Sequence, residues 1–233
     1  LKRCEDTFGV PMLNGYGQTE SCGVSASVKA DDSAEKKTST SGLAIQGVRL
    51  KVVDAKGQVL PCDTPGELCV DGPGKMLRYG DDAATEEAFD SDGWLRTGDI
   101  ATMDDEGYVT IVGRLKEMVI RGGENLYPAE IEAYLIEHPD IAEAAVFGLP
   151  DAKYGEELCA VLRPARNDHA NPDMVRDWCF SQVSRWKVPR YIAFVDTMPT
   201  TASGKIVKHE LRPQMAARFG ITKEKVTEQA DEL

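Results

Sequence analysis

The hydrophobic pattern of this chain changes character near residues 113–116, and this change limits the folds that the chain can adopt. Between residues 41 and 112, short runs alternate apolar and polar residues, as at 48–54 and 67–71, turn residues separate the runs, and a further strand is predicted at 108–112. Beyond residue 114, helical periodicity is interleaved with further strand-like runs, which lie at residues 142–149, 157–162 and 189–195. The pattern predicts an α+β fold in which a β-rich unit precedes a smaller α/β unit with a short mixed sheet and helices.

Three helices are predicted from signals at their first turns. Asp81 is a suitable N-cap for a short helix over residues 81–89. Pro128 is well placed in the first turn of a helix that runs to about residue 138. Asn171 and Pro172 open a third helix.

Composition excludes several classes of partner. The 233 residues include 39 acidic and 27 basic side chains, a formal net charge of −12, which argues against nucleic acid or an anionic membrane as the main partner. No apolar run approaches the roughly 20 residues of a membrane span. The six cysteines are scattered without a C-x-x-C pair, which is typical of reduced thiols in a cytoplasmic protein. Cys159 and Cys179 lie in apolar stretches and are predicted to pack in the core.

The segment Asn14-Gly-Tyr-Gly-Gln-Thr-Glu20 combines an aromatic ring, two glycines, a hydroxyl group and a carboxylate. The glycines, one of which is Gly17, allow close backbone approach on both sides of Tyr16. This set suits a purine ring stacked on Tyr16, with Glu20 reaching a magnesium ion among phosphates. A glycine-rich turn around a buried tyrosine explains the same residues equally well.

A second segment, Arg96-Thr-Gly-Asp99, places a carboxylate after a glycine in a predicted tight turn. A carboxylate held there can accept hydrogen bonds from two ribose hydroxyls, although a simple Asx-type turn is the alternative. Arg114 supplies a permanently charged donor at the boundary between the two units, where a ribose or phosphate could bind. Lys116 follows at the position where a hinge would absorb a backbone change.

Two further segments lie in the second unit. Gly122 and Gly123 leave the backbone bare of side chains, which suits a thin substrate passing close by, or simply a β-turn. Pro199-Thr-Thr-Ala-Ser-Gly-Lys-Ile-Val-Lys-His-Glu-Leu-Arg212 sets Lys205 on a small, flexible loop before a potential helix. Such a loop can carry an ammonium group into an anionic site, whereas the alternative is an exposed turn with a solvated lysine. Lys208 and Arg212 are interpreted as solvated or packing residues.

Together, these segments resemble the motifs of the adenylate-forming (AMP-binding) superfamily, which includes acyl- and aryl-CoA synthetases, luciferase-like enzymes and peptide-synthetase adenylation domains. The order, spacing and identities of the residues match over roughly residues 5–215. The segment Gly122-Gly-Glu-Asn-Leu-Tyr-Pro-Ala-Glu-Ile131 is most similar to the acyl-CoA synthetase branch. The resemblance implies an enzyme that joins a carboxylic acid to ATP, releases pyrophosphate and passes the acyl group to CoA.

The resemblance also implies roles for individual residues. The nucleotide-binding residues that it implies are Tyr16 at the adenine, Gly17, Thr19 at the phosphate, Asp99 at the ribose and Arg114 beside it. Glu20 would hold Mg²⁺, and Lys205 would bridge the substrate carboxylate and the α-phosphate. Lys116 would be the hinge of a small domain that swings between the two half-reactions. Gly122 and Gly123 would close a tunnel for the pantetheine arm of CoA, although many CoA ligases carry lysine where this chain has Gly122.

One family feature, the Ser/Thr/Gly-rich phosphate loop, does not occur in these 233 residues. The expectation is that the chain is the C-terminal part of an acid–CoA ligase and is inactive by itself. Residues 1–114 would then end the large AMP-binding domain, 115–220 would form the small mobile domain and 221–233 a flexible tail. The expected partners are a carboxylic acid, ATP, Mg²⁺ and CoA, in the cytoplasm, with the oligomeric state left open. Two alternatives remain: a non-catalytic nucleotide-sensing or docking remnant of this fold, and an amino-acid or aryl adenylation domain that loads a carrier protein.

Overall fold

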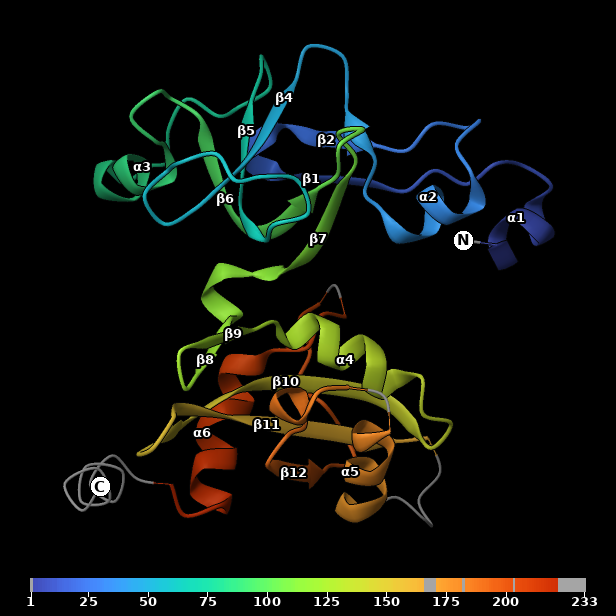
Figure 1. Cartoon of the computed structure of the whole chain (residues 1–233), viewed down its shortest axis with the longest axis vertical. Helices are drawn as coiled ribbons and strands as arrows, with labels where there is room; N and C mark the ends of the chain where they lie inside the picture. The colour runs from blue at the N-terminus through green and yellow to red at the C-terminus, as the bar shows by residue number, and fades with distance from the viewer. Residues whose placement is uncertain (1, 166–170, 182, 203, 222–233) are drawn as a thin grey trace. The chain divides into compact units, whose positions relative to one another are not determined.

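The computed structural model describes residues 2–165, 171–181, 183–202 and 204–221, within two compact units, Leu1–Leu115 and Lys116–Leu233 (Figure 1). The mixture of sheets and helices confirms the predicted α+β class. Residues 222–233, assigned to the predicted tail, lie outside the described residues, whereas Ile221 packs against a core cluster of the second unit.

The first unit is built around a four-stranded antiparallel sheet in the order β4-β5-β6-β7. Its strands are β4 (Arg49–Val53), β5 (Gly66–Asp71), β6 (Leu95–Met103) and β7 (Val109–Arg114). A buried cluster lies on one face, formed by Val52, Leu68, Ala101 and Val109. The alternating sequence correctly predicts β4, β5 and most of β7. It does not predict β6, whose residues 96–99 were expected to form a tight turn.

A second, smaller sheet of the first unit escapes prediction. It contains β1 (Gly15–Gln18), β2 (Gly23–Ser27) and β3 (Leu43–Ala44) in antiparallel order, and the short 3₁₀ helix η1 (Thr19–Ser21) connects the first two strands. The helix α1 (Lys2–Phe8) precedes β1 in sequence, and α2 (Ala34–Ser39) lies between β2 and β3. The strands are short and rich in glycine and serine, so their pairing depends on contacts between segments rather than on a hydrophobic pattern.

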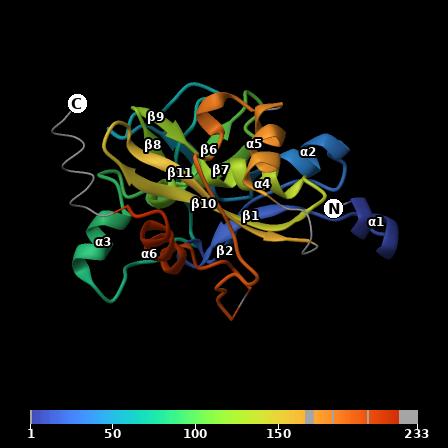
Figure 2. The same ribbon diagram turned by 90° about the horizontal axis from the view of Figure 1, so that it is seen from below.

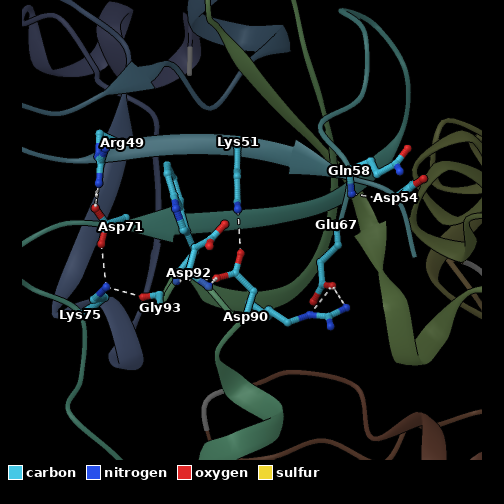
Figure 3. A network of polar contacts seen from close by, with 12 residues as sticks. Arg49, Lys51, Asp54, Gln58, Glu67, Asp71, Lys75, Asp90, Asp92 and Gly93 are labelled. Carbon is cyan, nitrogen blue, oxygen red and sulfur yellow. Dashed lines mark hydrogen bonds and ion pairs between the residues drawn. The ribbon is translucent and has the colours of Figure 1, made fainter. Parts of the chain in front are cut away.

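Charged side chains link β4 and β5 to the connection between α3 (Asp82–Ala88) and β6 (Figure 3). Asp71 accepts from Arg49 at 2.5 Å and from Lys75 at 2.6 Å, and Lys75 also donates to a backbone carbonyl just before β6. Lys51 donates to Asp90 at 2.7 Å, and both cations of β4 lie over the ring of Trp94. These contacts hold in place the segment that leads from α3 into β6. The predicted N-cap of α3 is confirmed, because Asp81 accepts from the N–H of Ala83.

The second unit contains a five-stranded mixed sheet. The strands β10, β11, β8 and β9 follow one another in antiparallel order, and β12 pairs with β11 in parallel. Their bounds are β8 (Val119–Arg121), β9 (Glu124–Leu126), β10 (Ile141–Asp151), β11 (Gly155–Pro164) and β12 (Tyr191–Phe194). The predicted strands correspond to β10, β11 and β12 with slightly different ends.

Helices cover both faces of this sheet (Figures 1 and 2). They are α4 (Pro128–Ile136), α5 (Pro172–Phe180) and α6 (Lys208–Arg218). Alternate residues of β10 face opposite ways: Ala144 and Val146 pack in a cluster with α4 and α5, whereas Ala145 and Phe147 pack with α6. Because helices cover β10 and β11 on both faces of the sheet, the sequences of these strands are nearly continuous apolar runs.

The predicted burial of Cys159 and Cys179 is confirmed, and Cys69 is also fully buried. All six cysteines are free thiols. Burial raises the pKa of the Cys159 thiol to about 12 and that of Cys179 to about 11. Among the described residues, no helix has the length and apolar character needed to cross a membrane.

Candidate functional site

Three residues predicted from separate motifs converge in the first unit. Asp99 on β6 is only 5% exposed, and each of its carboxylate oxygens accepts a hydrogen bond. Oδ2 accepts from the hydroxyl of Tyr16 on β1 at 2.6 Å, and Oδ1 accepts from Nε of Arg114 on β7 at 3.0 Å. A carboxylate has about four lone-pair sites. The two protein donors therefore fix Asp99 while leaving acceptor capacity on both oxygens.

The backbone around Asp99 is a distorted strand, which corrects the predicted tight turn. Asp99 pairs with Arg114 in the β6–β7 ladder, whose register shifts directly after Ile100. Gly98 has a φ of +70°, a left-handed conformation that favours glycine. The hydroxyl of Thr97 accepts from the N–H of Asp99 at 3.1 Å and donates to a carbonyl of β5 at 2.7 Å. The turn-like residues 96–99 therefore lie within the strand β6, at a local distortion of it.

A partly buried ion pair supports this distorted segment from β5. The carboxylate of Glu67, which is 7% exposed, accepts from Arg96 and from the N–H of Gly98. Arg96 and Gly98 lie on either side of Thr97, so Glu67 restrains the backbone that carries Asp99. The sequence gives little signal for this role, because Glu67 begins an ordinary alternating strand.

Tyr16 is partly buried and packs against the cluster of the four-stranded sheet. Burial and, secondly, the hydrogen bond to Asp99 raise the pKa of Tyr16 far above its usual range. Its hydroxyl therefore stays a donor to Asp99 at neutral pH. Gly17 is required for a local reason, since a Cβ atom there would lie 1.6 Å from the carbonyl oxygen of Gly23 on the paired strand.

Glu20 lies in η1, just after β1, and its Oε1 accepts from the hydroxyl of Tyr79 at 3.0 Å. Its backbone carbonyl accepts from the N–H of Met76 at 2.7 Å, so the loop after β5 holds this residue at two points. Thr19, the preceding residue, is exposed. The sequence did not identify Tyr79 as a partner of Glu20.

The described residues contain no cluster of three or more His, Cys, Asp or Glu side chains suited to a metal ion. Mg²⁺ is commonly bound through one or two carboxylates together with substrate phosphates and waters. A single, partly exposed carboxylate such as that of Glu20 fits this mode of binding.

In the second unit, Lys205 is exposed on a short hairpin that precedes α6. Thr200 and Ile206 form an isolated antiparallel bridge, and the N–H of Thr201 donates to the carbonyl of Lys205 at 2.8 Å. The N–H of Val207 donates to the carbonyl of Pro199 at 2.8 Å, which closes the base of the hairpin. The described residues of the predicted loop therefore form a hairpin that carries the exposed Lys205.

Lys116 is exposed within the 3₁₀ helix η2 (Leu115–Glu117), at the point where the chain divides into its two units. Gly122 and Gly123 form the two-residue turn between β8 and β9, with φ values of +59° and +88°. Positive φ at both positions is the requirement of a type I′ hairpin turn, which most side chains disfavour. A Cβ atom on Gly122 would also lie 3.2 Å from the ring of Tyr154.

Lys208 corrects one interpretation from the sequence. It is neither solvated nor a simple packing residue: its ammonium group contacts Glu117 at 2.5 Å and Glu132 at 2.9 Å. Arg212 is exposed, as expected. The sequence could not show that Lys208 and Arg212 have different surroundings, because the partners of Lys208 lie on distant segments of the chain.

Two family models match the chain. The model of the AMP-binding enzyme matches residues 1–80, and the model of the AMP-binding enzyme C-terminal domain matches residues 130–205. YngI of Bacillus subtilis strain 168, which is named as an acyl-CoA synthetase, is 43% identical over 209 residues, which cover 89% of this chain and 38% of YngI. The chain belongs to the adenylate-forming superfamily, in its acyl-CoA synthetase branch.

Further similarities support this membership. The medium-chain acyl-CoA ligase ACSF2 of Bos taurus, a mitochondrial protein by its name, is 43% identical over 90% of this chain and 34% of its own length. The o-succinylbenzoate CoA synthetase MenE from Bacillus subtilis, solved with its acyl-adenylate intermediate, superposes with a TM-score of 0.82 at 32% identity. That match covers 91% of this chain and 43% of MenE. The chain thus spans 38% of the length of YngI, 34% of ACSF2 and 43% of MenE.

Proposed function

We propose that the chain is the C-terminal part of an ATP-dependent acid–CoA ligase, which activates a carboxylic acid as acyl-AMP and transfers the acyl group to CoA. The observation that carries this proposal is the convergence of Tyr16, Asp99 and Arg114. Three motifs that are far apart in sequence build one restrained carboxylate, and such a carboxylate is the group that a ribose diol requires.

In this proposal the first unit binds the nucleotide. Asp99 accepts hydrogen bonds from the ribose hydroxyls, and Arg114 keeps the carboxylate oriented and adds positive charge nearby. Tyr16 anchors Asp99 through its hydroxyl, and its ring lines the adenine pocket together with the backbone at Gly17. Thr19, exposed at the end of β1, contacts a phosphate.

Glu20 would hold Mg²⁺ in the same unit. When bound, the ion would neutralise part of the phosphate charge during adenylation. The chain's own contribution is to keep the Glu20 carboxylate in place through the hydroxyl of Tyr79.

The second unit supplies the catalytic lysine. Adenylation brings a carboxylate against the α-phosphate, and the two anions repel each other. The ammonium group of Lys205 would lie between them and offset this repulsion as charge redistributes. The hairpin that carries Lys205 is exposed, so its tip is accessible to a nucleotide-bearing surface.

The transfer to CoA uses other residues of the second unit. Lys116 would be the hinge about which the small domain, residues 115–220, turns between the half-reactions. Gly122 and Gly123 would then close the tunnel for the pantetheine arm, since a turn without side chains leaves room for a thin substrate. The exposed backbone of this turn supports the assignment.

Fatty acids are the proposed substrate class, including medium-chain acids of the kind named for ACSF2. The cytoplasmic location stays a prediction, since relatives such as ACSF2 are named as mitochondrial. A non-catalytic remnant of the fold is the second candidate, motivated by the lack of a phosphate loop in these residues. The third is an adenylation domain that loads a carrier protein.

The test uses the complete natural polypeptide that carries these residues. We expect pyrophosphate release that depends on both ATP and a carboxylic acid, followed by formation of an acyl-CoA when CoA is added. A panel of fatty, aryl and short-chain acids identifies the substrate class, and the 233-residue polypeptide alone should release no pyrophosphate. Adenylation without any transfer to CoA would favour the carrier-loading alternative, and nucleotide binding without turnover on any acid would favour the remnant.

A further inference from the structure

Lys208, the first residue of α6, lies three positions after Lys205 and bridges two acidic side chains. Its Nζ is 2.5 Å from Oε2 of Glu117 and 2.9 Å from Oε1 of Glu132. The lysine side chain is 21% exposed, much less than expected for a solvated lysine. Glu117 belongs to η2 and Glu132 to α4, so a single ammonium group joins three elements.

Glu132 is the buried end of this cluster. Its side chain is 17% exposed, and the Oε1 atom that contacts Lys208 also accepts from the N–H of Val146 on β10 at 2.6 Å. Burial raises the pKa of Glu132, and the neighbouring ammonium group of Lys208 opposes this rise. A carboxylate in such surroundings needs its cation, because an unpaired buried charge is costly. The start of α6 is thereby fixed to both α4 and β10.

The same anchoring point is the root of the catalytic hairpin. Val207, next to Lys208, donates its N–H to Pro199, and this bond closes the hairpin that carries Lys205. The described residues between the two arms, Thr201, Ala202 and Gly204, are exposed, as is Lys205. The second arm of the hairpin runs directly into α6 at Lys208, so the position of this root influences the direction in which the tip extends.

We propose that Lys208 is a positioning residue for adenylation: its ion pairs with Glu132 and Glu117 fix the root of the hairpin and so aim the ammonium group of Lys205. This inference rests on the proposed role of Lys205. Lys208 itself touches no reacting atom, and it acts through the backbone of residues 205–208.

The contact with Glu117 gives the cluster a second consequence. Glu117 directly follows Lys116, the proposed hinge, and its side chain is 41% exposed. The ammonium group of Lys208 therefore connects the residue after the hinge with the root of the hairpin. Because Glu117 is more exposed than Glu132, its ion pair with Lys208 is screened by solvent and holds Lys208 in place less strongly than the ion pair with Glu132 does.

The experiment measures the two half-reactions separately in the complete natural polypeptide. Adenylation is followed by acid-dependent ATP–pyrophosphate exchange, and transfer by thioester formation from a supplied acyl-adenylate. We expect Lys208→Met to lower the kcat of adenylation about 10- to 100-fold, since small misplacements of a catalytic group have effects of this size. The KM for ATP and the rate of thioester formation should stay within about twofold, and Lys208→Arg should retain most of the adenylation rate.

Two further variants separate positioning from stability. Lys208→Met leaves Glu132 without a cation, whereas the double variant Lys208→Met/Glu132→Gln removes the uncompensated charge. The double variant should regain thermal stability but not adenylation. Arg163→Met, which breaks a surface ion pair with Glu143 in the same unit, is the matched control and should change neither half-reaction.

Three outcomes would overturn the inference. The first is adenylation within about twofold of the unmodified enzyme in Lys208→Met. The second is recovery of adenylation together with stability in the double variant. The third is an equal loss of both half-reactions. Lys205→Ala distinguishes the levels of failure: if it abolishes adenylation while Lys208→Met does not, only this inference fails, and if it has no effect, the proposed role of Lys205 fails as well.

Discussion

Replacing Asp99 with asparagine isolates the acceptor role of its carboxylate. The substitution keeps the shape of the side chain, and the amide oxygen can still accept from Nε of Arg114, 3.0 Å away in the native site. The amide nitrogen would take the place of Oδ2, which accepts from Tyr16. The variant therefore loses the negative charge and one of two acceptor oxygens while retaining the packing of a side chain that is only 5% exposed.

The magnitude follows from the number of hydrogen bonds lost. A ribose diol donates one hydrogen bond to each oxygen, and a hydrogen bond to a charged group contributes about 1.5–3 kcal/mol. Loss of one such bond raises the Kd for ATP about 10- to 100-fold, since about 1.4 kcal/mol corresponds to a factor of ten. The assay is equilibrium binding of ATP to the complete polypeptide, repeated with 2′-deoxy-ATP and 3′-deoxy-ATP.

Two comparisons make the assay decisive. If Asp99 binds the diol, the effects of Asp99→Asn and of deleting a ribose hydroxyl are not additive, because both remove the same interaction. Asp90→Asn, which perturbs a carboxylate paired with Lys51 in the same unit, is the matched control and should leave the Kd unchanged. An unchanged Kd in Asp99→Asn, or full additivity with both deoxynucleotides, would refute the assignment of Asp99 to the ribose.

The remaining predictions concern stability and accessibility. Gly17→Ala should destabilise the first unit by about 1–3 kcal/mol in denaturant unfolding, because the new Cβ atom would overlap the facing strand. Gly80→Ala is the control and should have little effect, since a Cβ atom there meets no atom within 4 Å. Equal effects of the two substitutions would contradict the reasoning. Arg96→Met should lower the free energy of unfolding by about 1–3 kcal/mol, because it leaves the carboxylate of Glu67 without its cation. The loss should be smaller than for a fully buried pair, since the Arg96 side chain is 38% exposed. An unfolding midpoint unchanged from that of the native protein would show that the pair is unimportant for stability. Peptide mapping after thiol labelling at pH 8 should find three cysteines protected until the protein unfolds, because burial raises their pKa values to about 11 or 12. Rapid labelling of these thiols in the folded protein would contradict this prediction. The same shifts mean that the folded protein retains thiol protons which the unfolded chain releases above about pH 9, so stability should fall as the pH rises from there toward 12. The protected residues are Cys69, Cys159 and Cys179.

Local signals in the sequence predict much of the fold. Asp81 and Asn171 are N-caps in the structure, and Asn171 accepts from two backbone N–H groups of the first turn of α5. Buried apolar runs correctly indicate β10 and β11. These features depend on residues close together in the chain, so the sequence displays them directly.

Features that depend on distant residues were not predictable in the same way. The contact between Tyr16 and Asp99 joins residues 83 positions apart, and the pair of Lys208 with Glu117 spans 91 positions. Each residue has an ordinary local pattern, and only the folded chain identifies its partner. The β6 strand was missed because Thr97 and Gly98 give the local signature of a turn, while pairing with β5 and β7 makes the segment a strand.

The proposed function depends above all on the ammonium group of Lys205 acting in adenylation and not in transfer to CoA. The most direct measurement compares the two half-reactions in Lys205→Ala of the complete polypeptide, with acyl-adenylate supplied for the second. We expect adenylation to fall on the order of a hundredfold or more, as for other groups that stabilise developing charge, while thioester formation is largely retained. Equal loss of both half-reactions, or unimpaired adenylation, would contradict it.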